Sequence, residues 1–227
     1  MIFLRHVLTV AKKDLRSEFR TKEAINSSFS FALVILLLFS FAFDPTEEMT
    51  REFSGGLLWI AFAFAGALLL NRSFVRELPN DCLDALIASP VPAAALFLGK
   101  SLANLLLLLL VEAVSFPVFG VFYNQRWTRQ FWPLLLVAIL GTWGFTVVGT
   151  MFSALTVNIR LREVMLPLLV YTTLIPCLMA SMQLTTLLLA GEPLTSVEGL
   201  VWLRFLIAFD VIFTTLAVVF VETVFIG

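Results

Sequence analysis

Residues 101–122 read SLANLLLLLLVEAVSFPVFGVF, and Glu112 is the only charged residue among them. A helix needs about 20 mostly apolar residues to cross the hydrocarbon core of a bilayer, and this run is long enough. Its apolar residues are continuous instead of alternating, which favours a helix over a strand of a transmembrane barrel. The stretch therefore predicts a membrane-spanning helix with one acid near its middle, five residues before Pro117.

Five more apolar runs of similar length lie on either side of this stretch. They cover residues 24–43, 54–70, 131–157, 164–189 and 200–226. The chain of 227 residues is 60% apolar and 14% charged, whereas an average soluble domain is about 45–50% apolar and about 25% charged. Of the 31 charged residues, 27 fall outside the six runs. We therefore expect an all-α polytopic membrane protein whose residues 24–227 form six transmembrane helices.

The distribution of lysine and arginine predicts the orientation, because the cytoplasmic loops of membrane proteins are enriched in both. Segments 1–23, 71–100 and 158–163 hold 11 of the 15 basic residues, and the other four lie on the opposite side. The first loop on that opposite side, residues 44–52, carries four acids and one base. Both termini are therefore expected in the cytoplasm.

Residues 1–23 are too charged to span the membrane, but they have the pattern of an amphipathic helix. Apolar side chains recur every three or four residues on one face, at Leu4, Leu8, Ala11, Leu15 and Phe19. The opposite face carries the basic residues Arg5, Lys12, Lys13, Arg16 and Arg20. Such a helix lies in the membrane interface. It is either a topology anchor or an elbow helix that also contacts a cytoplasmic partner.

The longest segment outside the spans, residues 71–100, contains a second, short helix pattern. Asn80 or Asp81 can cap this helix, and the following acids suit its N-terminus. Pro90 ends it, because proline lacks the amide donor that a helix needs. The two acids and the apolar stripe of this helix are Asp81, Leu83, Asp84, Leu86 and Ile87. The segment is either an ordinary interfacial loop or a docking helix for a cytoplasmic protein.

Two acids lie deep within the predicted spans, where charged groups are costly and are functional candidates by default. They are Glu112 in the third span and Asp210 in the sixth. Arg204 is six positions from Asp210, so the two residues do not share a helix face. Three interpretations are open. The acids are neutral and hydrogen-bonded within the bundle, or they pair with a partner subunit, or they line a transport path.

The sequence lacks the residue patterns of nucleotide binding and catalysis. Residues 94–101, AALFLGKS, end like a phosphate-binding loop but lack its first glycine and a preceding strand. Lys100 is instead expected to mark a membrane boundary. The one histidine, His6, cannot supply a catalytic dyad alone, and a bis-histidine haem site needs two. No basic tract with interleaved aromatic residues indicates nucleic-acid binding. We therefore expect a non-catalytic subunit without a metal or a stably bound cofactor.

Motifs spread over nearly the full chain carry a family resemblance. They are LRSEFR at 15–20, Arg72-Ser73-Phe74 with Glu77, Asp81-Cys82-Leu83-Asp84 with Pro90 and Gly99-Lys100, GTMFSALTVNIRLREVMLPLL at 149–169, Ile175-Pro176, Trp202-Leu203-Arg204 and Phe209-Asp210-Val211. In this order and spacing they resemble the CcmB family, the membrane subunits of an ABC-type haem exporter in cytochrome c maturation. The chain departs from the family at Cys82, where glycine is frequent, and at Thr172 and Thr173, where relatives often carry a proline.

The resemblance implies an ABC-2 (type V exporter-like) permease fold in a bacterial inner membrane. It also implies a CcmA-type ATPase that binds ATP and Mg²⁺, CcmC- and CcmD-type membrane partners, and a CcmE-type haem chaperone that the ATPase cycle releases. Haem would then be the cargo of the complex and not a cofactor of this chain. On this interpretation, the residues expected to couple the chain to the ATPase are Arg72, Arg76, Glu77, Asp81, Cys82, Leu83, Asp84, Leu86 and Ile87.

Two other functions stay open at this point. An ABC-2 permease of the same architecture could export another cargo, such as a lipid, a glycan or a drug. A stand-alone secondary transporter would usually show inverted repeats with interrupted helices, and we find no convincing internal repeat in the sequence.

Overall fold

The structure is a computed structural model, and it describes residues 2–43, 48–77, 90–125, 127–156 and 161–226. These parts of the chain contain helices and no strands, which confirms the expected all-α fold. In chain order, the helices are α1 (Ile2–Thr21), α2 (Glu23–Ala42), α3 (Glu48–Asn71), the 3₁₀ turn η1 (Val75–Glu77), α5 (Ala93–Phe122), the 3₁₀ turn η3 (Trp127–Gln130), α6 (Phe131–Thr156), α7 (Arg162–Ala190) and α8 (Val197–Ile226).

Six of these helices are long and apolar enough to cross a membrane, as predicted. Their candidate spans are Glu23–Ala42, Phe53–Asn71, Ala93–Phe122, Trp127–Thr156, Val164–Ala190 and Val197–Val221. The third differs most from its predicted bounds, because α5 begins at Ala93 and not at residue 101. The prediction placed Lys100 at the membrane boundary, whereas the structure buries this lysine inside α5.

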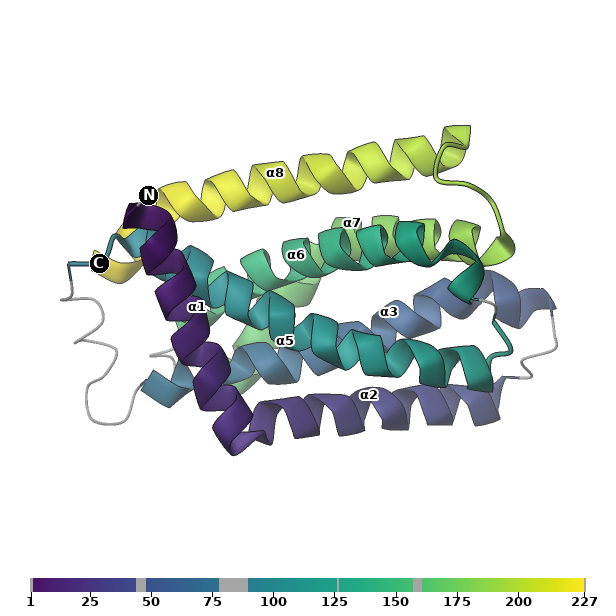
Figure 1. Ribbon diagram of the computed structural model, residues 1–227, viewed down its shortest axis with the longest axis horizontal. Helices are drawn as coiled ribbons and strands as arrows, with labels where there is room; N and C mark the ends of the chain where they lie inside the picture. The colour runs from purple at the N-terminus through teal and green to yellow at the C-terminus, as the bar shows by residue number, and fades with distance from the viewer. Residues whose placement is uncertain (1, 44–47, 78–89, 126, 157–160, 227) are drawn as a thin grey trace.

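The spanning helices form a bundle with α3 and α6 near its centre and α2 and α8 at its edges (Figure 1). Of the span in α3, 78% of the residues are buried, against 28% in α2 and in α8. Both ends of the chain lie at one end of the bundle, which we call the α1 end, and α1 crosses that end obliquely (Figure 1). Six crossings return the chain to the side on which it started, so this arrangement agrees with the span count.

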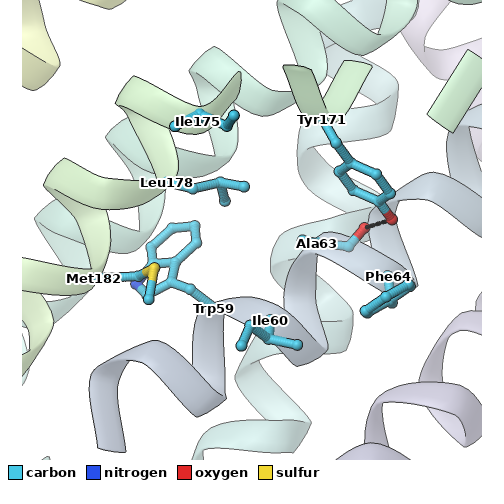
Figure 2. A pocket seen from close by; sticks show the side chains of 8 residues that line it. All are labelled: Trp59, Ile60, Ala63, Phe64, Tyr171, Ile175, Leu178 and Met182. Atoms are coloured by element: carbon cyan, nitrogen blue, oxygen red, sulfur yellow. Dashed lines mark hydrogen bonds between the residues drawn. The ribbon is translucent and has the colours of Figure 1, made fainter. Parts of the chain in front are cut away.

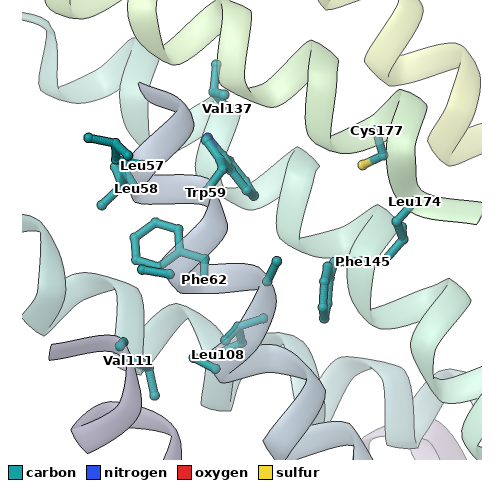
Figure 3. Close-up of a cluster of buried hydrophobic side chains, with 14 of the residues drawn as sticks. Leu57, Leu58, Trp59, Phe62, Leu108, Val111, Val137, Phe145, Leu174 and Cys177 are labelled. Atoms are coloured by element: carbon teal, nitrogen blue, oxygen red, sulfur yellow. The ribbon is translucent and has the colours of Figure 1, made fainter. Parts of the chain in front are cut away.

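The core contains apolar side chains of α2, α3, α5, α6, α7 and α8. The residues labelled in Figure 3 are contributed by α3, α5, α6 and α7. Phe62, Leu108 and Phe145 are among its largest fully buried members. Close packing of this kind excludes voids and gains many small dispersion contacts, which must hold a bundle together where the solvent is itself apolar. The central position of α3 follows from its small residues, since alanines and glycines let neighbouring helices approach closely.

A sharp turn joins α1 to α2, and a glutamate of α1 stabilises it. Lys22 takes the left-handed conformation at the turn, with φ of 57°. The Glu18 carboxylate accepts hydrogen bonds from the backbone amides of Ala24 at 2.8 Å and Ile25 at 3.0 Å. These amides belong to the first turn of α2, where a helix has no internal acceptors and favours negative charge. Glu18 therefore fixes the angle between α1 and the first span.

Candidate functional site

Four charged residues from three elements meet at the α1 end, and we call this cluster the charged junction. Its members are Lys13 and Asp14 of α1, Glu77 of η1 and Lys100 of α5. The Lys100 ammonium lies 2.7 Å from Glu77 Oε1 and 3.1 Å from Asp14 Oδ2. It also donates a hydrogen bond to the carbonyl oxygen of Ser73 at 3.2 Å. The junction thus ties α1, the segment after α3 and the start of α5 together.

Lys100 has no exposed surface, so its partners must offset a large desolvation penalty. The three oxygen acceptors match the three donors of an ammonium group. The Phe74 ring adds a cation–π contact, with its centroid 4.7 Å from Lys100 Nζ. Because a buried charge without partners is strongly destabilising, this geometry makes the position of η1 depend on the position of α5.

Lys13 closes the junction on its outer side and is half-exposed. Its ammonium lies 3.0 Å from Asp14 Oδ1 and 2.5 Å from Glu77 Oε1. Partial burial lowers the pKa of Lys13, but the neighbouring Asp14 and Glu77 carboxylates outweigh this effect and raise the pKa above its ordinary value of 10.5. Lys13 is therefore cationic at neutral pH, and the junction balances two lysines against two acids.

The approach of α1 to α5 depends on Gly99, the residue before the buried lysine. A Cβ atom at this position would lie 2.7 Å from Val10 Cβ and 2.8 Å from the Val7 carbonyl oxygen. Both distances are shorter than atoms in contact allow, so only glycine permits this packing. Val7 and Val10 are buried at the contact. The Gly99-Lys100 pair thus supplies both the close approach and the buried charge.

The face of α1 that packs on the bundle shares only Ala11 with the apolar face that the sequence predicts for the membrane interface. Val7, Val10, Ala11 and Glu18 are buried, whereas most of the predicted elbow residues are exposed. The exposed ones are Leu4, Leu8, Arg16 and Phe19, and Leu15 is half-buried. Helix α1 therefore has two apolar faces, one against α5 and one free of the chain's own bundle. The second suits a membrane interface or a partner, so both predicted roles stay predictions.

The structure describes only part of the predicted coupling segment. Arg72 forms an ion pair with Glu23 of α2, with 2.8 Å between Nη1 and Oε2. Glu77 belongs to the charged junction. The other seven predicted coupling residues lie outside the part whose side chains are described: Arg76, Asp81, Cys82, Leu83, Asp84, Leu86 and Ile87. Nothing in the sequence predicted that Glu77 and Lys100, on either side of this segment, bind each other.

Polar contacts continue from the junction into the bundle along α5. Asn104, one turn after Lys100, donates hydrogen bonds to Ser73 Oγ at 3.0 Å and to Thr150 Oγ1 of α6 at 2.9 Å. Two turns further on, Thr142 of α6 donates to Glu112 Oε1 at 2.6 Å. Helices α5 and α6 are therefore joined by side-chain hydrogen bonds both near the α1 end and deep in the span.

Glu112 and Asp210 both face the interior of the chain's own bundle. Glu112 is 1% exposed and Asp210 is 6% exposed. Glu112 Oε2 and both carboxylate oxygens of Asp210 have no hydrogen-bond partner in the described part of the chain. Asp210 lies against Gly144 of α6, where a Cβ atom would be 2.5 Å from Asp210 Oδ1.

These two acids lie on different sides of α6. Glu112 contacts Thr142 and Asp210 lies beside Gly144, and residues two apart on a helix point in nearly opposite directions. Within the described ranges, no three histidine, cysteine or carboxylate side chains lie close enough together to hold a metal ion. Each acid is buried within the chain's own bundle, at a separate place. The three roles given for these acids stay predictions.

The chain is similar to known proteins over most of its length. The profile of a family described as CcmB protein matches residues 5–223. Heme exporter protein B of Pseudomonas aeruginosa is 29% identical over 206 residues, which cover 91% of each chain. Heme exporter protein B of Rhodobacter capsulatus is 29% identical over 172 residues, which cover 76% of this chain and 78% of the relative. The relative of the same name in Haemophilus influenzae is 28% identical over 178 residues.

Proposed function

The chain belongs to the CcmB family, and on this basis we propose that it is the membrane subunit of an ABC transporter that exports or handles haem for c-type cytochrome assembly. The similar proteins that bear the name heme exporter protein B support this proposal. So do the six helices long enough to cross a membrane. Haem is the cargo of the complex in this proposal, and this chain holds it only transiently.

A CcmA-type partner subunit supplies the ATPase activity. It binds ATP and Mg²⁺ and grips the docking helix predicted between Glu77 and Lys100. The observation that carries this proposal is the charged junction, because Glu77 and Lys100 bracket that segment and bind each other. A displacement of the segment therefore acts on α5 and α1 together.

Helix α5 transmits the movement across the membrane. It runs from Ala93 to Phe122 without interruption and is hydrogen-bonded to α6 at two depths. ATP-driven closure of the ATPase subunits would shift its first turns, and the other end of α5 would then move relative to CcmC- and CcmD-type partners. Release of the haem-loaded CcmE-type chaperone follows from this step. The chain itself stays non-catalytic.

We place the complex in a bacterial inner membrane with the α1 end in the cytoplasm. Most of the lysine and arginine residues belong to the segments at that end. An ATPase needs cytoplasmic ATP, and the predicted docking helix follows η1 at the same end of the bundle. Localisation and partner contact therefore agree with one orientation.

The first test is purification of the tagged chain in mild detergent, with the bound subunits identified by mass spectrometry. We expect an ATPase subunit and haem-handling membrane partners. Recovery of an ATPase without any haem-handling partner would favour export of another cargo. Transport by the purified chain alone would favour a secondary transporter.

A matched pair of variants tests the docking helix. The double variant Leu83→Glu, Leu86→Glu should reduce recovery of the ATPase about tenfold or more, because apolar anchors dominate such interfaces. Val197→Glu lies at the opposite end of the bundle on a residue that is 85% exposed, and it should leave recovery unchanged. Normal ATPase recovery and normal chaperone release with the double variant would contradict a coupling role.

A further inference from the structure

A groove of about 210 Å³ lies between α3 and α7 and opens on the side of the bundle (Figure 2). Its floor includes Trp59 and Ala63, which are buried, and its rim includes Ile60, Phe64 and Ile175, which are exposed. Ile175 has the largest exposed fraction of the three, 54%. The full lining is Trp59, Ile60, Ala63, Phe64, Tyr171, Ile175, Leu178 and Met182.

The groove lies at the depth of the hydrocarbon core. Trp59 to Phe64 occupy the middle of the span Phe53–Asn71, and Tyr171 to Met182 occupy the middle of the span Val164–Ala190. An opening at this depth faces lipid tails, because headgroups and water lie about 15 Å away on either side. The environment of the groove is thus apolar on its open side as well as on its floor.

No polar group in the lining needs a partner from outside. The Tyr171 hydroxyl donates a hydrogen bond to the Ala63 carbonyl oxygen at 3.3 Å, as Figure 2 shows. Trp59 Nε1 donates to Thr185 Oγ1 at 2.9 Å. A water molecule needs two to four polar partners to stay in a buried site, and this lining offers none that is free. The groove is therefore dry.

We infer that this groove binds one acyl chain of a membrane phospholipid. An empty groove would forfeit the dispersion contacts of its aromatic and aliphatic lining. A transmembrane helix is about 10 Å wide with its side chains, so only single side chains of such a helix would enter a space of this volume. Pockets for drug-sized ligands start at about 300 Å³, so bulky planar or polycyclic ligands do not fit either.

The ends of the groove match an unbranched chain. Phe64 and Tyr171 close one end, with their ring centroids 5.8 Å apart in an edge-to-face arrangement. Met182 lies at the other end, and its flexible thioether adapts to irregular apolar shapes. The bound acyl chain would fill the space between the central helix α3 and its neighbour α7, so the lipid would be retained when the surrounding lipid is exchanged for detergent.

The test compares two tryptophan substitutions on lipid-facing positions of the full-length chain. Ile60→Trp fills the groove, whereas Leu38→Trp lies on the exposed face of α2, outside it. Each protein is extracted from membranes and washed with detergent. Native mass spectrometry then measures the mass of the chain together with the phospholipid bound to it. We expect the wild type and Leu38→Trp to retain one more phospholipid per chain than Ile60→Trp. Equal retention by all three proteins would overturn the inference.

Two further measurements distinguish loss of the lipid from misfolding of the variant and from coverage of the groove by a partner subunit. Ile175→Trp fills the groove from α7, and it should lose the same single phospholipid while the far-UV circular dichroism of the chain stays unchanged. A phosphatidylcholine with a photoreactive group at the end of its acyl chain should label the α3 and α7 peptides of the assembled complex several-fold more than the exposed face of α2. If a partner subunit covers the groove, this labelling disappears in the complex, and that result would also overturn the inference.

Discussion

Lys100 has no exposed surface, yet it lies within the end of a helix that crosses the membrane. Two carboxylates, one carbonyl oxygen and one aromatic ring surround its ammonium group. In a soluble protein such a pair is often no more stable than an apolar substitute, but breaking it is costly. The cluster therefore constrains where α1, η1 and α5 lie more than it adds to overall stability.

At this scale we predict the effect of removing one carboxylate. Glu77→Gln leaves Lys100 with Asp14 as its remaining carboxylate, so it should lower the free energy of unfolding by about 3 kcal/mol, the lower end of the range for breaking a buried pair. The double variant Glu77→Leu, Lys100→Met removes both charges and should cost less than Glu77→Gln. Unfolding in detergent mixtures with increasing dodecyl sulfate measures both values.

The control is Glu192→Gln, whose side chain is exposed at the opposite end of the bundle. It should leave the free energy of unfolding unchanged. If Glu77→Gln were as mild as this control, the junction would contribute nothing to the position of Lys100.

Among the elements, α1 is held by two contacts besides the charged junction. Glu18 caps the start of α2 with two hydrogen bonds, and Gly99 lets α1 rest on α5. Because both ends of α1 are fixed, it moves with α2 and α5 together. Its outward face stays available, with Leu4 and Leu8 exposed beside the basic residues.

We predict that Gly99→Val separates α1 from α5. Overpacking of a close contact costs about 1–3 kcal/mol. Because each 1.4 kcal/mol changes a population tenfold, α1 should open about 5-fold to 150-fold more often. Tryptic cleavage after its basic residues in the intact chain measures this opening. The control is Ala113→Val, at an exposed position of α5 away from α1. It should keep the wild-type cleavage rate. Equal rates for the two variants would show that Gly99 is not needed for the contact.

At the scale of the whole molecule, the two termini share one end of the bundle (Figure 1). The segments that the sequence assigns to this end carry 11 of the 15 lysine and arginine residues. Basic loops resist translocation, so the charge distribution and the architecture favour the same orientation.

This orientation predicts the outcome of reporter fusions. Green fluorescent protein fused to the C-terminus should fluoresce, because it folds in the bacterial cytoplasm. Alkaline phosphatase inserted between α7 and α8, near Thr195, should be active, because it needs the periplasm. Active phosphatase at the C-terminus would contradict the orientation and move the proposed ATPase contact to the other end of the bundle.

The sequence by itself determined the number and helical character of the spans and, apart from the start of the third, their approximate bounds. These are local properties, because about 20 consecutive apolar residues must satisfy their backbone hydrogen bonds within one helix to cross a membrane. The same reasoning placed the amphipathic helix before the first span and singled out Glu112 and Asp210 as buried acids. Both acids are indeed buried in the bundle.

Only the tertiary structure decided which residues meet. Lys100 pairs with Asp14, 86 positions earlier, and Lys13 pairs with Glu77, 64 positions later. A local pattern carries no information about such pairs, so the sequence placed Lys100 at a membrane boundary and did not predict that Val7 and Val10 form a second, buried face of α1. Gly99 lets α1 approach α5 closely at these two residues. The spans follow from local apolar length, whereas the charged junction and the lipid groove follow from how the helices pack.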